Sequence, residues 1–181
     1  NDIDVEDSIV NAWDIYRVSG KINRDNRSVS PLLLARWNQG NPYNDMCPED
    51  LNGPGGNALV GCVAVSMVQV MHYWSYPEYG YGNHSYYHWD YGTLTANFNT
   101  FYDFDNMPNN IGTEAVQLIS YHAGVAVEMG YGADGSGAWV GSGYPCAMTA
   151  MRDHFLYNDG MQFKYKSSYN WNGWRNLLKN E

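Results

Sequence analysis

Cys62 is the residue whose surroundings best suit covalent chemistry. It stands at the start of an almost wholly apolar run of helical length, GCVAVSMVQVMHYWSYP (residues 61–77). Two glycine-rich stretches, GPGG and VG, lead into it, so the backbone there can approach a ligand closely. The unpaired N–H groups and the dipole at a helix N-terminus stabilise an anion, which favours the nucleophilic thiolate. The alternative is a cysteine that packs as a small hydrophobic residue.

A cysteine nucleophile needs an imidazole beside it, and the sequence offers five histidines. His72 lies on the same expected helix as Cys62, about 15 Å further along its axis, which excludes it as the partner. His84 and His88 belong to a Tyr-rich segment, whereas His122 and His154 fall in other expected helices. The sequence therefore identifies no base for Cys62.

Two other segments were candidates for metal binding, and neither has the right pattern. His84, His88 and Asp90 lie in HSYYHWD, but two histidines at this spacing share a face only on a helix, which this segment does not favour. The segment DFDN (103–106) lacks the EF-hand spacing and its distal Glu. We expect no metal and no other cofactor. Cys47 and Cys146 are expected to pack as inert thiols.

The composition restricts the class of protein. The chain is 44% hydrophobic, enough for a folded core, and carries a net charge of −9 with no basic run. Binding to nucleic acid or to an anionic membrane is therefore disfavoured, and no apolar run reaches the roughly 18–20 residues that span a bilayer. Its polar character comes largely from the amides of 20 Asn and the phenols of 16 Tyr rather than from Lys and Glu, which favours an exported protein. Because the sequence begins at Asn1 rather than Met, we expect a processed chain.

Periodicity and turn signals predict the following elements. They are a helix over 5–17, a polar linker over 19–30, a helix over 61–74 that is buried all round, loops with short strands over 79–110, a helix over 113–124 that is capped by Thr113 and stopped by Gly124, a strand over 125–132, a helix over 144–157, and a last helix capped by Asn172.

Four segments, in order, resemble the streptopain family of papain-like cysteine peptidases. They are WNQGNPYN (37–44), GCVAVSMVQVMHYWSYP (61–77), AGVAVEMGYG (123–132) and GSGA (135–138). The resemblance implies an α+β papain-like fold, with a helical half built on the cysteine helix and the beginning of a β half. Residues 28–181 would be the N-terminal part of the peptidase domain, and residues 1–27 the tail of a propeptide.

The same resemblance implies roles for individual residues. Cys62 corresponds to the catalytic nucleophile, and Gln39 to the glutamine whose side-chain amide helps the Cys62 N–H hold the oxyanion. Gly135, Ser136 and Gly137 correspond to a loop that lines the substrate cleft. The implied function is a secreted cysteine endopeptidase of bacterial type that acts on peptides and proteins through an acyl-thioester.

The family's catalytic histidine lies in a Gly-His strand beyond the helix that WRNLLKNE (174–181) resembles. We therefore expect that segment to be missing from these residues, whether it belongs to a second chain or to a longer polypeptide. The alternative is a catalytically dead module that binds peptides or carbohydrates.

The 181-residue chain, purified without any second polypeptide, is expected not to hydrolyse a peptide substrate, because it lacks an imidazole partner for Cys62. A fluorogenic peptide assay on this chain and on its Cys62→Ala variant checks this. Turnover that disappears in the variant would show that one of the five histidines does serve as the base.

Overall fold

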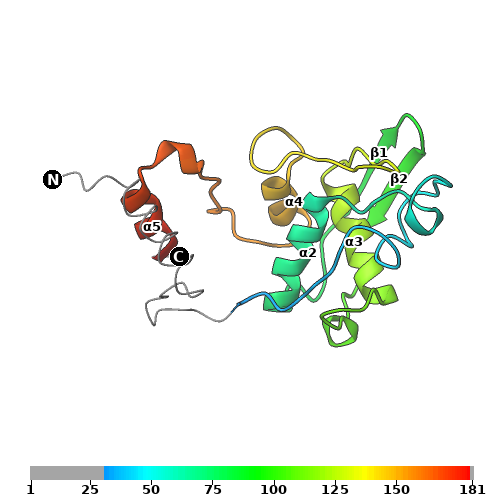
Figure 1. Ribbon diagram of the computed structural model, residues 1–181, viewed down its shortest axis with the longest axis horizontal. Helices are drawn as coiled ribbons and strands as arrows, with labels where there is room; N and C mark the ends of the chain where they lie inside the picture. Colours follow the sequence, from blue (N-terminus) through cyan, green and yellow to red (C-terminus); the bar gives the residue numbers. More distant parts are fainter. Residues whose placement is uncertain (1–30, 180–181) are drawn as a thin grey trace, which may run out of the picture. The chain divides into compact units, whose positions relative to one another are not determined.

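The computed structural model describes residues 31–179 (Figure 1). The chain divides into two units, Asn1–Leu32 and Leu33–Glu181, and the elements named below all belong to the second. The expected helix over 5–17 and linker over 19–30 lie outside the described residues. The elements are η1 (Pro54–Gly56), α2 (Cys62–Trp74), β1 (Asn83–His88), β2 (Gly92–Asn97), η2 (Phe104–Asn106), α3 (Glu114–Ala126), α4 (Ala147–Asp153), η3 (Lys166–Ser168) and α5 (Trp171–Lys179).

Helix α2 begins at Cys62 and ends at Trp74, as its apolar run predicts. Ser75 closes it in the left-handed conformation, and its N–H bonds back to the last turn. The expectation that α2 is buried all round is wrong for the described residues. One stripe, Val63, Ala64, Met67, Val68 and Met71, enters the core, while Cys62, Ser66, Tyr73 and Trp74 are exposed.

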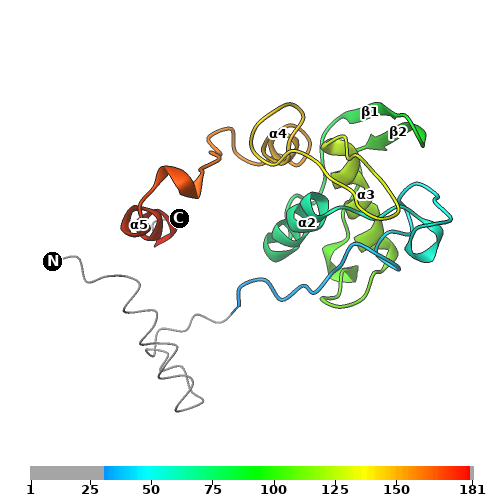
Figure 2. The same ribbon diagram turned by 45° about the horizontal axis from the view of Figure 1, so that its top comes forward.

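Helix α3 lies between α2 and the β1–β2 hairpin and packs against both (Figures 1 and 2). The hairpin is antiparallel, pairing Asn83 with Asn97 and His88 with Gly92. On β2, Leu94 and Ala96 are buried whereas their neighbours are exposed, which is the alternation of a strand with one covered face. The short strands expected within 79–110 are thus confirmed.

The end of α3 differs from expectation. Gly124 does not stop the helix, which continues to Ala126. A Cβ on Gly124 would lie on the Tyr131 hydroxyl, so this glycine admits a close neighbour instead of ending the helix. The strand expected over 125–132 is also wrong, because Val125 and Ala126 are the last residues of α3 and only a single bridge, between Gly130 and Gly137, follows. Thr113 precedes α3, but its hydroxyl donates to the Asn106 carbonyl and does not cap the helix.

The last two helices are placed correctly, but their ends differ from expectation. Helix α4 covers half of the expected 144–157, because the Thr149 hydroxyl bonds the backbone of Cys146 and fixes the helix start there. Helix α5 begins at Trp171, and the Asn170 side chain accepts the Gly173 N–H at 2.8 Å. The capping residue is therefore Asn170, and the expected cap at Asn172 is wrong.

Residues 37–151 contain no Lys or Arg, although they contain ten Asp and Glu. Their fold rests on packing and hydrogen bonds, such as the Trp37 indole N–H to the Pro108 carbonyl at 2.8 Å. Arg152, the first cation after this stretch, pairs with Asp153 at 2.7 Å. Within residues 31–179, no helix is long and apolar enough to cross a membrane.

The buried imidazole of His122 makes the stability of the fold depend on pH. Its Nδ1 lies 2.9 Å from the Tyr102 hydroxyl, and burial lowers its pKa from 6.5 to about 4. Below pH 6.5 the unfolded chain takes up a proton that the folded chain refuses until about pH 4. The free energy of unfolding should therefore fall by up to about 3 kcal/mol as the pH drops through this window.

Urea denaturation of the chain and of His122→Gln at pH 7 and pH 4.5 checks this, since the remaining titrating groups are common to both. The stability advantage of the unsubstituted chain should shrink at the lower pH. An advantage that stays constant would contradict the role of His122.

Candidate active site

The segment that leads into Cys62 is held from two sides. The Leu59 N–H donates to the Gly132 carbonyl at 3.0 Å, and the Val60 N–H donates to the Gln39 carbonyl at 2.9 Å. Successive N–H groups of an extended chain point in opposite directions, so two different loops can bond neighbouring residues. The structure thus brings together three regions that the sequence singled out: the loop of Gln39, the cysteine helix and the loop of Ser136.

Gly61 makes the turn from this segment into α2. Its φ is +90°, and a Cβ there would lie 2.6 Å from the Met129 sulfur and 3.2 Å from the Ser136 Cβ. Only glycine satisfies both the backbone angle and the space. The close packing fixes where α2 begins, and therefore where Cys62 stands.

Cys62 is the first residue of α2 and is exposed. The N–H groups of the first helical turn have no partner within the helix, and they lend this end partial positive charge. The other two cysteines are buried, as expected. Burial raises the pKa of Cys47 to about 12, so that thiol stays protonated. Cys62 is therefore the cysteine available to a substrate.

Gln39 is half-buried in the loop that follows Trp37. Its backbone carbonyl accepts the Val60 N–H, two residues before Cys62. The adjacent Asn38 side chain accepts the Gly40 N–H at 2.8 Å and tightens the turn. The loop therefore holds the backbone of Gln39 beside the segment that leads into Cys62.

The loop of Gly135, Ser136 and Gly137 is built on an inward-facing serine. The Ser136 hydroxyl donates to the Leu59 carbonyl at 2.6 Å and accepts the Gly132 N–H at 3.1 Å. Gly135 and Gly137 are exposed, with open space where a Cβ would be. In this loop Ser136 is thus an anchor. The two glycines are exposed, while the N–H and carbonyl of Gly137 both bond to Gly130.

Each histidine has a partner of its own. His72 Nε2 lies 2.7 Å from the Met107 carbonyl oxygen, and His84 Nε2 lies 3.0 Å from Glu128 Oε1. His88 stacks on Tyr91, and His122 meets Tyr102. His154 stacks on Phe98 with ring centroids 4.2 Å apart, and burial lowers its pKa.

Metal ligation is not supported by the residues that the structure describes. No group of three His, Cys, Asp or Glu side chains among them is arranged to hold an ion. His84 is paired with Glu128 instead, and His88 Nδ1 accepts the Asp90 N–H at 3.2 Å.

Sequence reasoning passed over one residue in this region, Asn44. It belongs to the motif WNQGNPYN, yet its side chain is fully buried and reaches the loop before Cys62. The only signal for it in the sequence is a polar side chain directly after a turn, which is no different from many surface asparagines.

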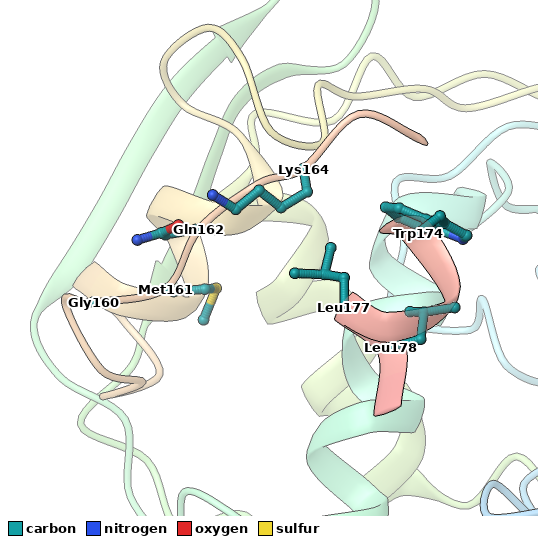
Figure 3. Close-up of a pocket in the computed structure, with 7 residues that line it drawn as sticks. All are labelled: Gly160, Met161, Gln162, Lys164, Trp174, Leu177 and Leu178. Carbon is teal, nitrogen blue, oxygen red and sulfur yellow. The ribbon is translucent and has the colours of Figure 1, made fainter. Parts of the chain in front are cut away.

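Helix α5 and residues 160–164 enclose a separate pocket of about 520 Å³ (Figure 3). Leu177 points toward the 160–164 segment in this view. None of the expected site residues lines this pocket.

The exposed cysteine at the start of α2 and the glutamine loop bonded beside it define a papain-like cysteine peptidase fold. The chain belongs to the Peptidase C10 family, whose sequence model matches residues 37–181. The streptopain-family resemblance and the α+β papain-like fold are thereby confirmed.

Relatives and solved structures agree with this assignment. The chain is 29% identical over 161 residues to the thiol protease/hemagglutinin PrtT of Porphyromonas gingivalis, covering 83% of this chain and 18% of that protein. It is 25% identical over 173 residues to streptopain of Streptococcus pyogenes, covering 80% of this chain and 41% of streptopain. The chain thus spans less than half the length of these curated relatives.

Active interpain A cysteine protease of Prevotella intermedia superposes with a TM-score of 0.72 at 32% identity, over 83% of this chain and 63% of that one. A mutant fragment of prointerpain A from the same organism gives a TM-score of 0.73 at 28% identity, covering 96% of this chain and 60% of that one.

Gly61→Ala should destabilise the fold more than Gly56→Ala does. Both glycines have φ near +90°, but a Cβ on Gly56 would meet nothing within 4 Å. The backbone strain is thus common to both variants, and the clash with Met129 adds about 1–3 kcal/mol to the loss in Gly61→Ala alone. Urea denaturation measures the difference.

Iodoacetamide labelling of the folded protein reports on Cys62, because Cys47 and Cys146 are buried. The labelling rate should change in Gly61→Ala and stay unchanged in Gly56→Ala. Equal stabilities and equal labelling rates for the two variants would show that Gly61 does not position the nucleophile.

Proposed function

We propose that this chain is the nucleophile-bearing part of a secreted cysteine endopeptidase. The observation that carries the proposal is the exposed Cys62 at the start of α2, bonded through Val60 to the loop of Gln39. This arrangement places a thiol, a helix N-terminus and a neutral amide donor in one region.

In the proposed mechanism the Cys62 thiolate attacks the scissile carbonyl. The carbonyl oxygen becomes an oxyanion, which accepts hydrogen bonds from the Gln39 side-chain amide and the Cys62 N–H. The peptide C–N bond then breaks, and the leaving amine takes a proton from an imidazolium. Water attacks the resulting thioester, which releases the acid product and restores the thiol.

The imidazole of this mechanism is proposed to come from polypeptide outside these 181 residues, on the same chain or on a second one. The support is that each of the five histidines contacts other residues, and that His72, ten residues along α2 from Cys62, lies with its Nε2 against the Met107 carbonyl oxygen. The proposed enzyme needs no cofactor.

Peptide and protein substrates are proposed to lie against the exposed face of the loop at Gly135 and Gly137, with Ser136 holding the loop. Residues 1–27 are proposed to be the tail of a propeptide removed near Arg27 and Ser28. The low content of Lys and Glu beside abundant Asn, Gly and Tyr supports secretion.

In a form of the protein that includes the proposed histidine segment, Gln39→Ala should lower kcat by about 10²–10³, because one oxyanion donor is removed. Gln162→Ala is the matched control, since Gln162 is exposed in the 160–164 segment and should leave kcat unchanged. A fluorogenic peptide assay gives kcat and KM, and mass spectrometry after treatment with a peptidyl epoxide should find the label on Cys62.

The contrary result is a protein that neither turns over peptides nor takes the epoxide label, yet binds glycans after Cys62 has been alkylated. Such a protein would be a binding module, acting through exposed rings such as Tyr87 and Trp89 at the end of the hairpin.

A further inference from the structure

Asn44 makes an unusual set of contacts for a buried side chain. It is fully buried, and its Nδ2 lies 2.8 Å from the Pro54 carbonyl oxygen, 3.1 Å from that of Asn57 and 3.2 Å from that of Ala58. An amide NH2 carries two hydrogens, so three carbonyls share two donors. The Asn44 side chain thus bonds to carbonyl groups at both ends of the turn that contains η1.

The other end of the same amide has no partner. Asn44 Oδ1 is buried without a hydrogen bond among the residues described. A buried acceptor left empty is unfavourable, and an apolar side chain of similar shape would avoid that penalty. The favourable contacts of this side chain therefore come from its NH2 group, which faces the turn before Cys62.

The loops on either side of this contact are interlocked. A Cβ on Gly40 would meet Pro54 at 3.3 Å, and a Cβ on Gly55 would overlap the Asn41 side chain. The loop over 38–44 thus contacts the chain before Cys62 at two places: through Asn44 at residues 54–58, and through the Gln39 carbonyl at Val60.

We propose that Asn44 is a positioning residue for the reaction, which sets the Gln39 amide in register with Cys62 by tying the 38–44 loop to residues 54–58. This inference rests on the proposed function for its kinetic consequence. The tie itself is a property of the fold and can be tested separately. An oxyanion site depends on such registration, because a donor displaced by about 1 Å costs on the order of 100-fold in rate.

A residue that only stabilised the fold would behave differently. Ile119 is fully buried in α3 and is not part of either loop. Ile119→Val removes one core methyl group and should lower stability without changing kcat. It is therefore the control for loss of stability alone.

The first measurement is amide hydrogen exchange at Val60, whose N–H bonds to the Gln39 carbonyl. In Asn44→Ser this amide should exchange at least about tenfold faster than in the unsubstituted protein, because opening of the loop exposes it. In the control Ile119→Val its exchange rate should rise by less. Asn44→Leu keeps the branch at Cγ and removes the donors, and it serves if Asn44→Ser does not fold. An unchanged Val60 amide in both variants would overturn the proposal.

The second measurement is kinetic, in the form of the protein used for Gln39→Ala. Asn44→Ser should lower kcat by about 10- to 100-fold with KM within about threefold, and should weaken inhibition by a peptide aldehyde by a similar factor. The aldehyde forms a tetrahedral adduct that uses the oxyanion donors. Faster exchange at Val60 with unchanged kcat and unchanged aldehyde inhibition would also overturn the proposal.

The two experiments separate the inference from the proposed function. If the unsubstituted protein neither turns over substrate nor labels at Cys62, the proposed function fails. In that case exchange at Val60 still decides whether Asn44 ties the two loops.

Discussion

The hydrogen bond from the Val60 N–H to the Gln39 carbonyl is the contact on which the site depends. It joins two segments that lie 21 positions apart in the chain, and it fixes them two residues before Cys62. Neighbouring contacts hold the same segment in place. Ser136 and Gly132 bond to Leu59 from the other side, and Met129 packs against Gly61. Together these contacts hold the Gln39 loop and the start of α2 in a fixed arrangement.

Rigidity at this point comes from packing rather than from charge. Helix α2 buries one stripe of apolar side chains, and α3 supports it from behind while also covering the hairpin. Burial of each large side chain in that stripe contributes about 1.5–3 kcal/mol. With no Lys or Arg from residue 37 to 151, the body cannot use conventional salt bridges within itself. The stability of the core that supports the first turn of α2 should therefore depend little on ionic strength.

The sequence was sufficient for the features that local pattern determines. The apolar run placed α2 correctly from Cys62 to Trp74, and the motifs around Gln39, Cys62 and Ser136 named three segments that do meet. Helix ends were misplaced by a few residues where a neighbouring side chain sets the cap, as at Asn170, and the larger errors arose where distant contacts decide. Val125, Val127 and Met129 alternate as in a strand. In the structure all three are buried where α3 ends in the core. Over five residues, alternation alone cannot distinguish a strand from such a buried helix end. Likewise, the inward turn of Ser136 and the reach of Asn44 depend on partners far along the chain.

The absence of Lys and Arg between Arg36 and Arg152 also determines how the protein can be cut. A protease that cleaves only after basic residues has no site within the stretch that holds Gln39, Cys62 and the 132–137 loop, whether that stretch is folded or not. The same protease has five sites in the first 36 residues, among them Arg27. A protease of this kind can thus trim the N-terminal segment at several places and still leave residues 37–152 in one piece.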